Sequence, residues 1–299
     1  MKAALKLALV AAAQVVPAEA QELSYAGSMQ FSTGSYIFTE PTRTLSLQNG
    51  INATFGGLRL SAAIPAILQN SGAITIVGGT VLPTGGEDHG AVGSRQGGQS
   101  VPMSPGGPRH SLLPGPDLYV QQTATDSVVA EPGSYTLSAG DLLLSGGLAL
   151  YQGRTWLRSL ELSVHAKAPL NSLDSGIGTG RWDFGAGTNV AAALGSVLAV
   201  LDLSYWWYGD LAELELRDGL SWGASLGLPV SRSVSLTAMA FGSNRVIQTA
   251  EPARAVSVGL IYRLSPRASL SFSGGVGLSE TSPDASLSLG WLWTLSNGK

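Results

Sequence analysis

The side chains of this 299-residue sequence best suited to catalysis are a serine and a glutamate that lie close to a histidine. Glu161, Ser163 and His165 follow at intervals of two, which places their side chains on one face of a strand. Such residue types can form a hydrolytic relay, but on one strand they point the same way, so His165 is better read as lining an interior. His89 and His110 lack metal-ligand spacing and the chain has no cysteine, so the sequence predicts no catalytic centre, no metal site and no cofactor.

Other charged side chains share the polar face of alternating segments and are expected to line the same interior. The full set is Arg59, Glu161, His165, Lys167, Arg181, Asp183, Asp202, Glu215, Arg217 and Arg263. Its fixed charges are five positive and four negative, so they predict no strong preference for anions or cations.

These residues belong to an alternating pattern, with a period of two residues, that runs along nearly the whole chain after residue 22. In 285–295, for example, Leu287, Leu289 and Trp291 alternate with Ser286 and Ser288, which is typical of a half-buried strand. The pattern predicts about twelve strands, an even number as in bacterial outer-membrane barrels. They are expected at 22–36, 44–56, 57–66, 141–152, 155–168, 179–194, 197–208, 215–230, 232–244, 253–264, 268–279 and 284–296.

Short turns alternate with long links between these strands, and charged residues share a face with Gly and Ser while large apolar residues fill the other. Lipid outside and a polar inside explain that division, whereas a secreted sandwich or solenoid, which also alternates, would turn its charges outward. A membrane sheet must also close, because an open edge leaves unpaired N–H and C=O groups in hydrocarbon. We therefore expect an all-β protein, a transmembrane antiparallel up-and-down β-barrel.

Composition and the first twenty residues agree with export to the outer membrane of a Gram-negative envelope. Only 12% of residues are charged, and the net charge of −3 argues against nucleic-acid binding. Lys2, Lys6, an apolar run and Ala18-Glu19-Ala20 resemble a cleaved signal peptide over 1–20, leaving a barrel over 21–299. The expected partners are outer-membrane lipid, the outer-membrane assembly machinery and a small-molecule permeant.

Aromatic residues near the strand ends are expected at the two membrane interfaces. They are Trp156, Trp182, Trp207, Tyr262, Trp291 and Trp293. Trp222 falls in mid-strand and does not fit, and the adjacent Trp206 and Trp207 must place one ring inward.

A Gly/Pro/Ser-rich insertion spans 67–140 and is expected to be a loop. Its apolar pieces at 73–77 and 118–120 could extend the flanking strands or fold inward as a constriction, and we favour extension or a simple loop.

Several junctions resemble the transporter-like outer-membrane family named after the meta-pathway of phenol degradation. The similar segments are 61–65 (SAAIP), 139–142 (AGDL), 166–170 (AKAPL) and 176–185 (GIGTGRWDFG). Leu170, the longer insertion and the ending Ser296-Asn297-Gly298-Lys299 depart from that family's pattern. The resemblance implies passage of small molecules, aromatic ones among them, across the outer membrane.

The sequence thus favours a passive channel or transporter for small solutes, aromatic or hydrophobic ones included, and not an enzyme. The alternatives are a non-conducting surface barrel with an adhesive or structural role through 67–140 and, third, an embedded lipid hydrolase that uses His165.

Overall fold

The computed structural model describes residues 22–70, 72–77, 80–85, 89–94, 101, 135–171, 177–211 and 214–297. The expected signal peptide and residues 118–120 lie outside these ranges. The described elements, in chain order, are β1 (Glu22–Gly34), β2 (Thr42–Phe55), β3 (Leu58–Gln69), β4 (Thr75–Val77), β5 (Thr80–Leu82), α2 (His89–Gly93), β6 (Thr136–Ala139), β7 (Leu142–Gln152), β8 (Leu157–Ala168), β9 (Asp183–Leu194), β10 (Val197–Trp207), β11 (Gly219–Pro229), β12 (Val234–Ser243), β13 (Arg254–Ser265), β14 (Ala268–Gly277) and β15 (Ala285–Asn297).

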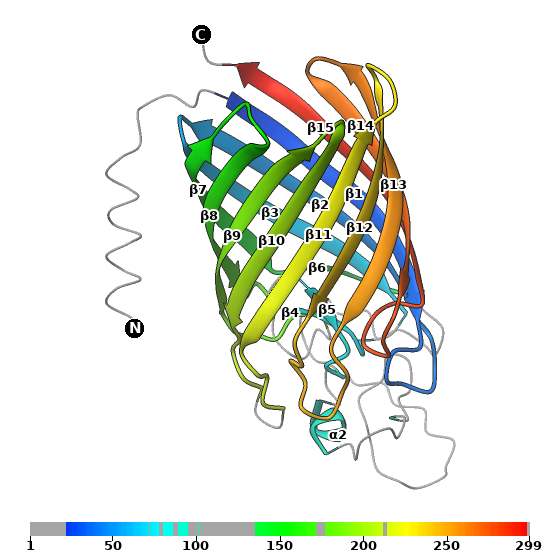
Figure 1. Ribbon diagram of the computed structural model, residues 1–299. Coiled ribbons are helices and arrows are strands. Elements are labelled where there is room, and N and C mark those ends of the chain that lie inside the picture. Colours follow the sequence, from blue (N-terminus) through cyan, green and yellow to red (C-terminus); the bar gives the residue numbers. More distant parts are fainter. Residues whose placement is uncertain are drawn as a thin grey trace, which may run out of the picture.

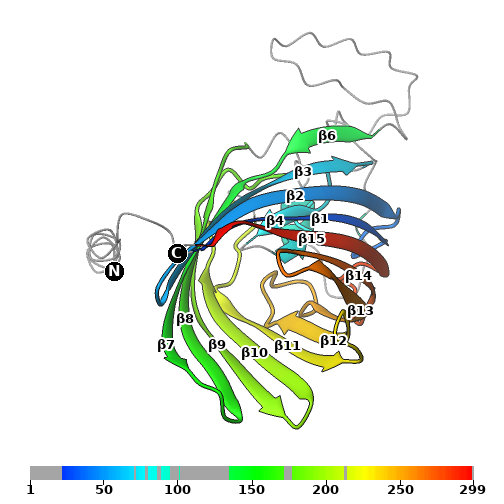
Figure 2. The ribbon, with the colours of Figure 1, turned by 90° about the horizontal axis from the view of Figure 1, so that it is seen from above.

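All of these strands except β4 and β5, which form a separate two-stranded sheet, make one closed antiparallel barrel (Figures 1 and 2). The ring closes because β1 pairs with β15 and β2 with both β1 and β3. Strands β6 and β7 occupy one position, since both pair with β3, so the described part of the chain forms a twelve-strand barrel. The predicted fold class is confirmed.

The break between β6 and β7 has a local cause at Pro65 of β3. The N–H of Gly140 donates to the carbonyl of Pro65 at 2.6 Å, and a Cβ on Gly140 would lie 2.6 Å from the proline ring. Only glycine fits there, so the strand bends between Ala139 and Leu142 and Asp141 turns away from regular pairing.

The two faces of the wall differ as the alternation predicts. Phe31 and Met29 of β1 lie opposite Leu287 and Leu289 of β15, and all four side chains are exposed on the outside. The neighbouring positions, such as Ser28 opposite Gly290, face inward. An apolar outer face around an interior rich in Ser and Gly is typical of outer-membrane barrels. None of the described helices is long and apolar enough to cross a membrane.

Long loops gather at the end of the barrel opposite the one where β1 begins and β15 ends, and β4, β5 and α2 lie there too (Figure 1). They share one apolar cluster, which we call the loop-end cap. Its buried members are Tyr36, Ile37, Phe38, Ala73, Ile74, Val77, Leu82, Val92, Val101, Leu211, Leu214, Leu216, Val246, Ile247, Ala250 and Ala253. Strand β4 pairs with β5 in a separate two-stranded sheet and does not continue β3, and Ala73, Ile74 and Val77 are buried in the cap. The expectation that 73–77 extend a strand or form a simple loop is therefore wrong.

Aromatic side chains lie toward both ends of the outer face. The ring of Trp293 stacks on Tyr25 at 5.8 Å near the short turns, and Trp182 stacks on Phe184 at 5.7 Å near the long loops. Trp222, which seemed to lie in mid-strand, is three residues from the loop end, because β11 begins at Gly219 rather than at residue 215.

The remaining expected interface aromatics also have definite places. Trp156 stands in the turn before β8, and Tyr262 faces outward opposite Val234. Trp207 lies edge-on to Tyr205 on the outer face, while its neighbour Trp206 points inward.

Candidate functional site

The interior of the barrel is the candidate site, and near the short turns it carries an ion pair. Arg59 of β3 reaches Glu161 of β8 with an Nη1 to Oε2 distance of 3.4 Å, and their side chains are 59% and 18% exposed. Gly147 stands between them in the sheet, and a Cβ there would collide with the Glu161 carboxylate. The glycine thus gives the glutamate room to lie across β7.

His165 lies deeper and packs against the wall. Its Nε2 is 3.0 Å from the hydroxyl of Ser163, and its ring stacks on Trp206 at 5.4 Å. Trp206 in turn lies over Gly185 and donates from Nε1 to the hydroxyl of Ser221 at 3.1 Å. Among the described residues, no carboxylate hydrogen-bonds to His165, so the serine and histidine lack the third member of a relay.

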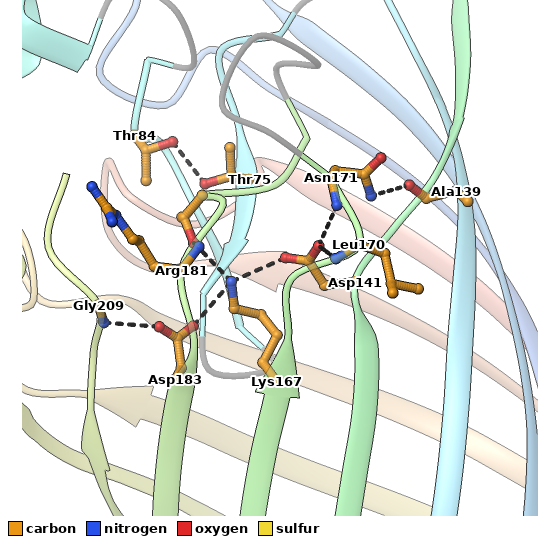
Figure 3. Close-up of polar contacts among 11 residues, drawn as sticks. Thr75, Thr84, Ala139, Asp141, Lys167, Leu170, Asn171, Arg181, Asp183 and Gly209 are labelled. Carbon is orange, nitrogen blue, oxygen red and sulfur yellow. Dashed lines mark hydrogen bonds and ion pairs between the residues drawn. The ribbon is translucent and has the colours of Figure 1, made fainter. Parts of the chain in front are cut away.

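A fully buried cluster of charged side chains lies in the barrel wall near the loop end (Figure 3). The Lys167 ammonium lies 3.0 Å from Asp141, 3.3 Å from Asp183 and 2.8 Å from the hydroxyl of Thr179. All three charged side chains are at most 1% exposed. Such a buried group is tolerated only with several partners, because desolvation of each charge costs several kcal/mol.

The two carboxylates also hold loop backbone. Asp141 Oδ1 accepts from the N–H groups of Leu170 and Asn171 at 3.0 and 3.3 Å, and Asp183 Oδ1 accepts from Gly209 at 3.0 Å. The cluster therefore joins β7, β8 and β9 to two long loops. Sequence reasoning missed Asp141, whose only signal was its place in the segment Ala139 to Leu142 that resembles a family motif.

Three expected lining residues do not stand on the barrel strands. Arg181 precedes β9, and Glu215 and Arg217 precede β11, all three exposed at the loop end. The alternation there reflects the loop-end cap: Leu214 and Leu216 are buried in it and form isolated bridges to Leu211 and Ile247. A loop that packs one face on a cluster alternates like a strand.

The register places the other expected lining residues on the inner face. Asp202 lies opposite Asn189 and Gly223, in the same file as Ser204 and Trp206. Arg263 lies opposite Ser269 and is exposed near the short turns.

Inward side chains are buried at the loop ends of most strands, although Ser24 and Ala191 near the short turns are buried too. Inward side chains at the loop ends of the strands are buried on most of the circumference: Ser32, Thr44, Ile67, Lys167, Asp183, Trp206, Ser243 and Ala255. Inward Phe241, next to Ser243 at the loop end of β12, is 42% exposed, and the inward side chains of Met239 and Leu198, nearer the short turns, are 48% and 43% exposed. Large apolar side chains remain exposed inside a barrel only where other side chains do not fill it. The described inner wall is thus accessible toward the short turns and covered at the loop ends of most strands.

No group of three or more His, Asp or Glu within the described ranges is placed to hold a metal ion.

Comparisons with known proteins give only fold-level likenesses. No family model and no curated protein sequence matches this chain. Among solved structures, the NanC porin is 7% identical over 91% of this chain and 100% of its own, with a TM-score of 0.48. The CymD monoaromatic hydrocarbon channel is 9% identical over 94% and 90%, with a TM-score of 0.44. Outer membrane phospholipase A from Escherichia coli is 11% identical over 93% of each chain, with a TM-score of 0.42. At these values none of them decides between passage and catalysis.

Proposed function

We propose that this protein is an outer-membrane channel for small solutes and that its insertion closes the loop-end mouth. The observation that carries the proposal is the contrast along the inner wall between exposed side chains such as Leu198 and Met239 and the buried ones at the loop ends of most strands, the Lys167 cluster among them. A barrel that served only as a scaffold would have no need of a hollow interior ending at a folded stopper. Neither positive nor negative side chains dominate the inner wall, so the size of a solute and its hydrogen bonds would determine which solutes pass.

The solutes are proposed to include small aromatic or hydrophobic molecules. Two features support this: the resemblance of the strand junctions to the phenol meta-pathway family, and the exposed apolar side chains inside the barrel. Insertion through the assembly machinery after removal of residues 1–20 belongs to the same proposal.

The register supplies a clean way to remove the stopper. Gln69 of β3 lies opposite Thr136 of β6, so a two-residue turn can join them. Deleting residues 71–135 and placing one glycine between Asn70 and Thr136 creates an Asn-Gly turn, the favoured type for this connection. The barrel strands and the Lys167 cluster stay intact in this variant.

Planar-bilayer recordings then test the function. We expect small or rare conductance steps from the full chain and larger, persistent steps from the deletion variant. A double variant, Ile74→Ser with Val77→Ser, keeps the insertion but weakens its packing, and it should fall between the two. Folding is checked by the mobility shift between unheated and boiled samples in detergent.

Two other outcomes would each refute part of the proposal. Absence of steps from both folded proteins would favour the non-conducting surface role. Equal conductance of the full chain and the deletion variant would show that the insertion is not a stopper.

An enzymatic role is the weaker candidate, because His165 has a serine partner at 3.0 Å and, within the described part of the chain, no carboxylate hydrogen-bonded to its ring. Phospholipid hydrolysis that disappears in His165→Ala but persists in His89→Ala would overturn the assignment as a non-enzyme.

A further inference from the structure

Asp202 differs from the other carboxylates of the inner wall in its partners. Glu161 is paired with Arg59, and Asp183 with Lys167. Asp202 accepts a hydrogen bond from the Ser204 hydroxyl at 3.3 Å, and no cationic side chain among the described residues forms an ion pair with it. It is also part-buried on the inner face of β10. A carboxylate so placed is left with capacity for a positively charged partner.

Open space lies beside this carboxylate along the sheet. The register sets Asp202, Gly223 and Phe241 in one row across β10, β11 and β12. A Cβ built on Gly223 would meet only the Asp202 Cβ, at 3.8 Å. No close neighbour therefore requires a glycine at position 223. Its effect is that no side chain occupies the space beside Asp202. The two flanking Cα atoms stand two strand spacings apart, about 10 Å.

The far side of this gap is apolar and exposed. Phe241 and Met239 both point inward from β12 and are 42% and 48% exposed. Their neighbours across the sheet are small: Gly223 and Ala255 beside Phe241, and Ser225 and Ser257 beside Met239. The faces of the ring and the thioether are thus open to a solute in the interior.

We infer that Asp202, Gly223 and Phe241, with Met239, form a binding site for small organic ammonium ions. This inference deepens the proposed channel function and rests on it for its physiological meaning. The ammonium group would be held by the carboxylate in a charge-assisted hydrogen bond, and the hydrocarbon part would cover Phe241 and Met239. A cation beside an aromatic face gains further attraction from the ring quadrupole. Gly223, which has no side chain, leaves room for the solute between Asp202 and Phe241.

Other charged groups near the row do not cancel this preference. Glu161 lies in the same row beyond Asn189, and it engages Arg59. Lys167 lies farther toward the loops and is already shared by two carboxylates. The His165 imidazole is also within electrostatic range of Asp202, but among the described residues it forms no ion pair with that carboxylate.

Equilibrium dialysis of the full-length folded protein in detergent tests the site with three matched probes: benzylammonium, neutral benzyl alcohol and benzoate. The wild-type chain should bind benzylammonium at least about tenfold more tightly than benzyl alcohol, and benzoate least, because a hydrogen bond to a charged group is worth about 1.5–3 kcal/mol. Asp202→Asn should remove the preference for benzylammonium and leave benzyl alcohol unchanged. Glu22→Gln, at the open mouth, is the control carboxylate and should change neither.

A second variant covers the case in which Asp202→Asn does not fold. Gly223→Leu fills the open space and should weaken all binding at the site about tenfold or more. Equal binding of the three probes by wild type, or unchanged binding in both folded variants, overturns the site. Conductance in potassium chloride is recorded in parallel: probe binding without conductance overturns the channel alone, and conductance without a probe preference overturns the site alone.

Discussion

Lys167 is the residue whose replacement should most weaken the loop end of the barrel. Lys167→Met removes the ammonium from between Asp141 and Asp183, and keeps a side chain of similar length. Both buried carboxylates then lose the ammonium that lies between them, and breaking one side of a buried ion pair costs about 3–5 kcal/mol. We expect a loss of that size in the free energy of unfolding.

A matched control variant tests whether the expected loss of unfolding free energy comes from the charges of the two buried carboxylates. In the triple variant Lys167→Met, Asp141→Asn, Asp183→Asn, all three charges of the cluster are removed together, and amide oxygens still accept from Leu170 and Gly209. This variant should recover most of the lost stability, since replacing a whole buried ion cluster by neutral groups is often close to neutral.

Urea unfolding in phospholipid vesicles, followed by tryptophan fluorescence, measures the change, and the gel mobility of unheated samples shows which variants fold. Limited proteolysis adds a local readout, because loss of the cluster should expose the backbone at 169–171 and 208–210 before the strands unfold. A Lys167→Met protein that unfolds within about 1 kcal/mol of wild type would refute the reasoning, as would a triple variant less stable than the single one.

Three further predictions follow from other contacts. Arg59→Glu reverses an exposed charge of the inner wall that pairs with Glu161, and should move the reversal potential in a salt gradient toward cation selectivity; an unchanged potential would place Arg59 off the permeation path. Gly185→Ala should cost about 1–3 kcal/mol of unfolding free energy, because its Cβ would lie 2.9 Å from the Trp206 ring, whereas Gly227→Ala, with only a carbonyl at 3.9 Å, should be neutral; equal urea midpoints would contradict this. Burial raises the pKa of Tyr36 to about 12, so the unfolded cap releases this proton first and the cap loses stability as pH rises above about 10. Channel openings should become more frequent between pH 9 and 11, less so in Tyr36→Phe; identical profiles would exclude Tyr36 as a cause.

Burial also raises the pKa of Tyr208, the next residue after β10 at the loop end. Its ionisation acts in the same direction as that of Tyr36, so Tyr36→Phe is expected to reduce the pH effect rather than abolish it.

Much of the barrel could be predicted because strand alternation is a local property. Phe31 and Ser32 face opposite sides wherever β1 lies, and one apolar face requires lipid on that side. The inward position of Arg59, Glu161 and Asp202 follows from the same parity. Strand ends were less certain where loops imitate strands, as at Leu214 and Leu216.

What the sequence determined by itself was the parity of each strand: which residues turn toward lipid, which turn inward, and that the wall must close on itself. Only the tertiary structure decided which inward residues meet. Lys167 lies 26 residues from Asp141 and 12 from Thr179, and Ile74 joins a cluster with Leu216 and Ile247. Those contacts depend on the register between strands and on the path of long loops. Neither the register nor the path of the loops can be recognised from an alternating pattern in the sequence, because both depend on packing between segments that lie far apart along the chain.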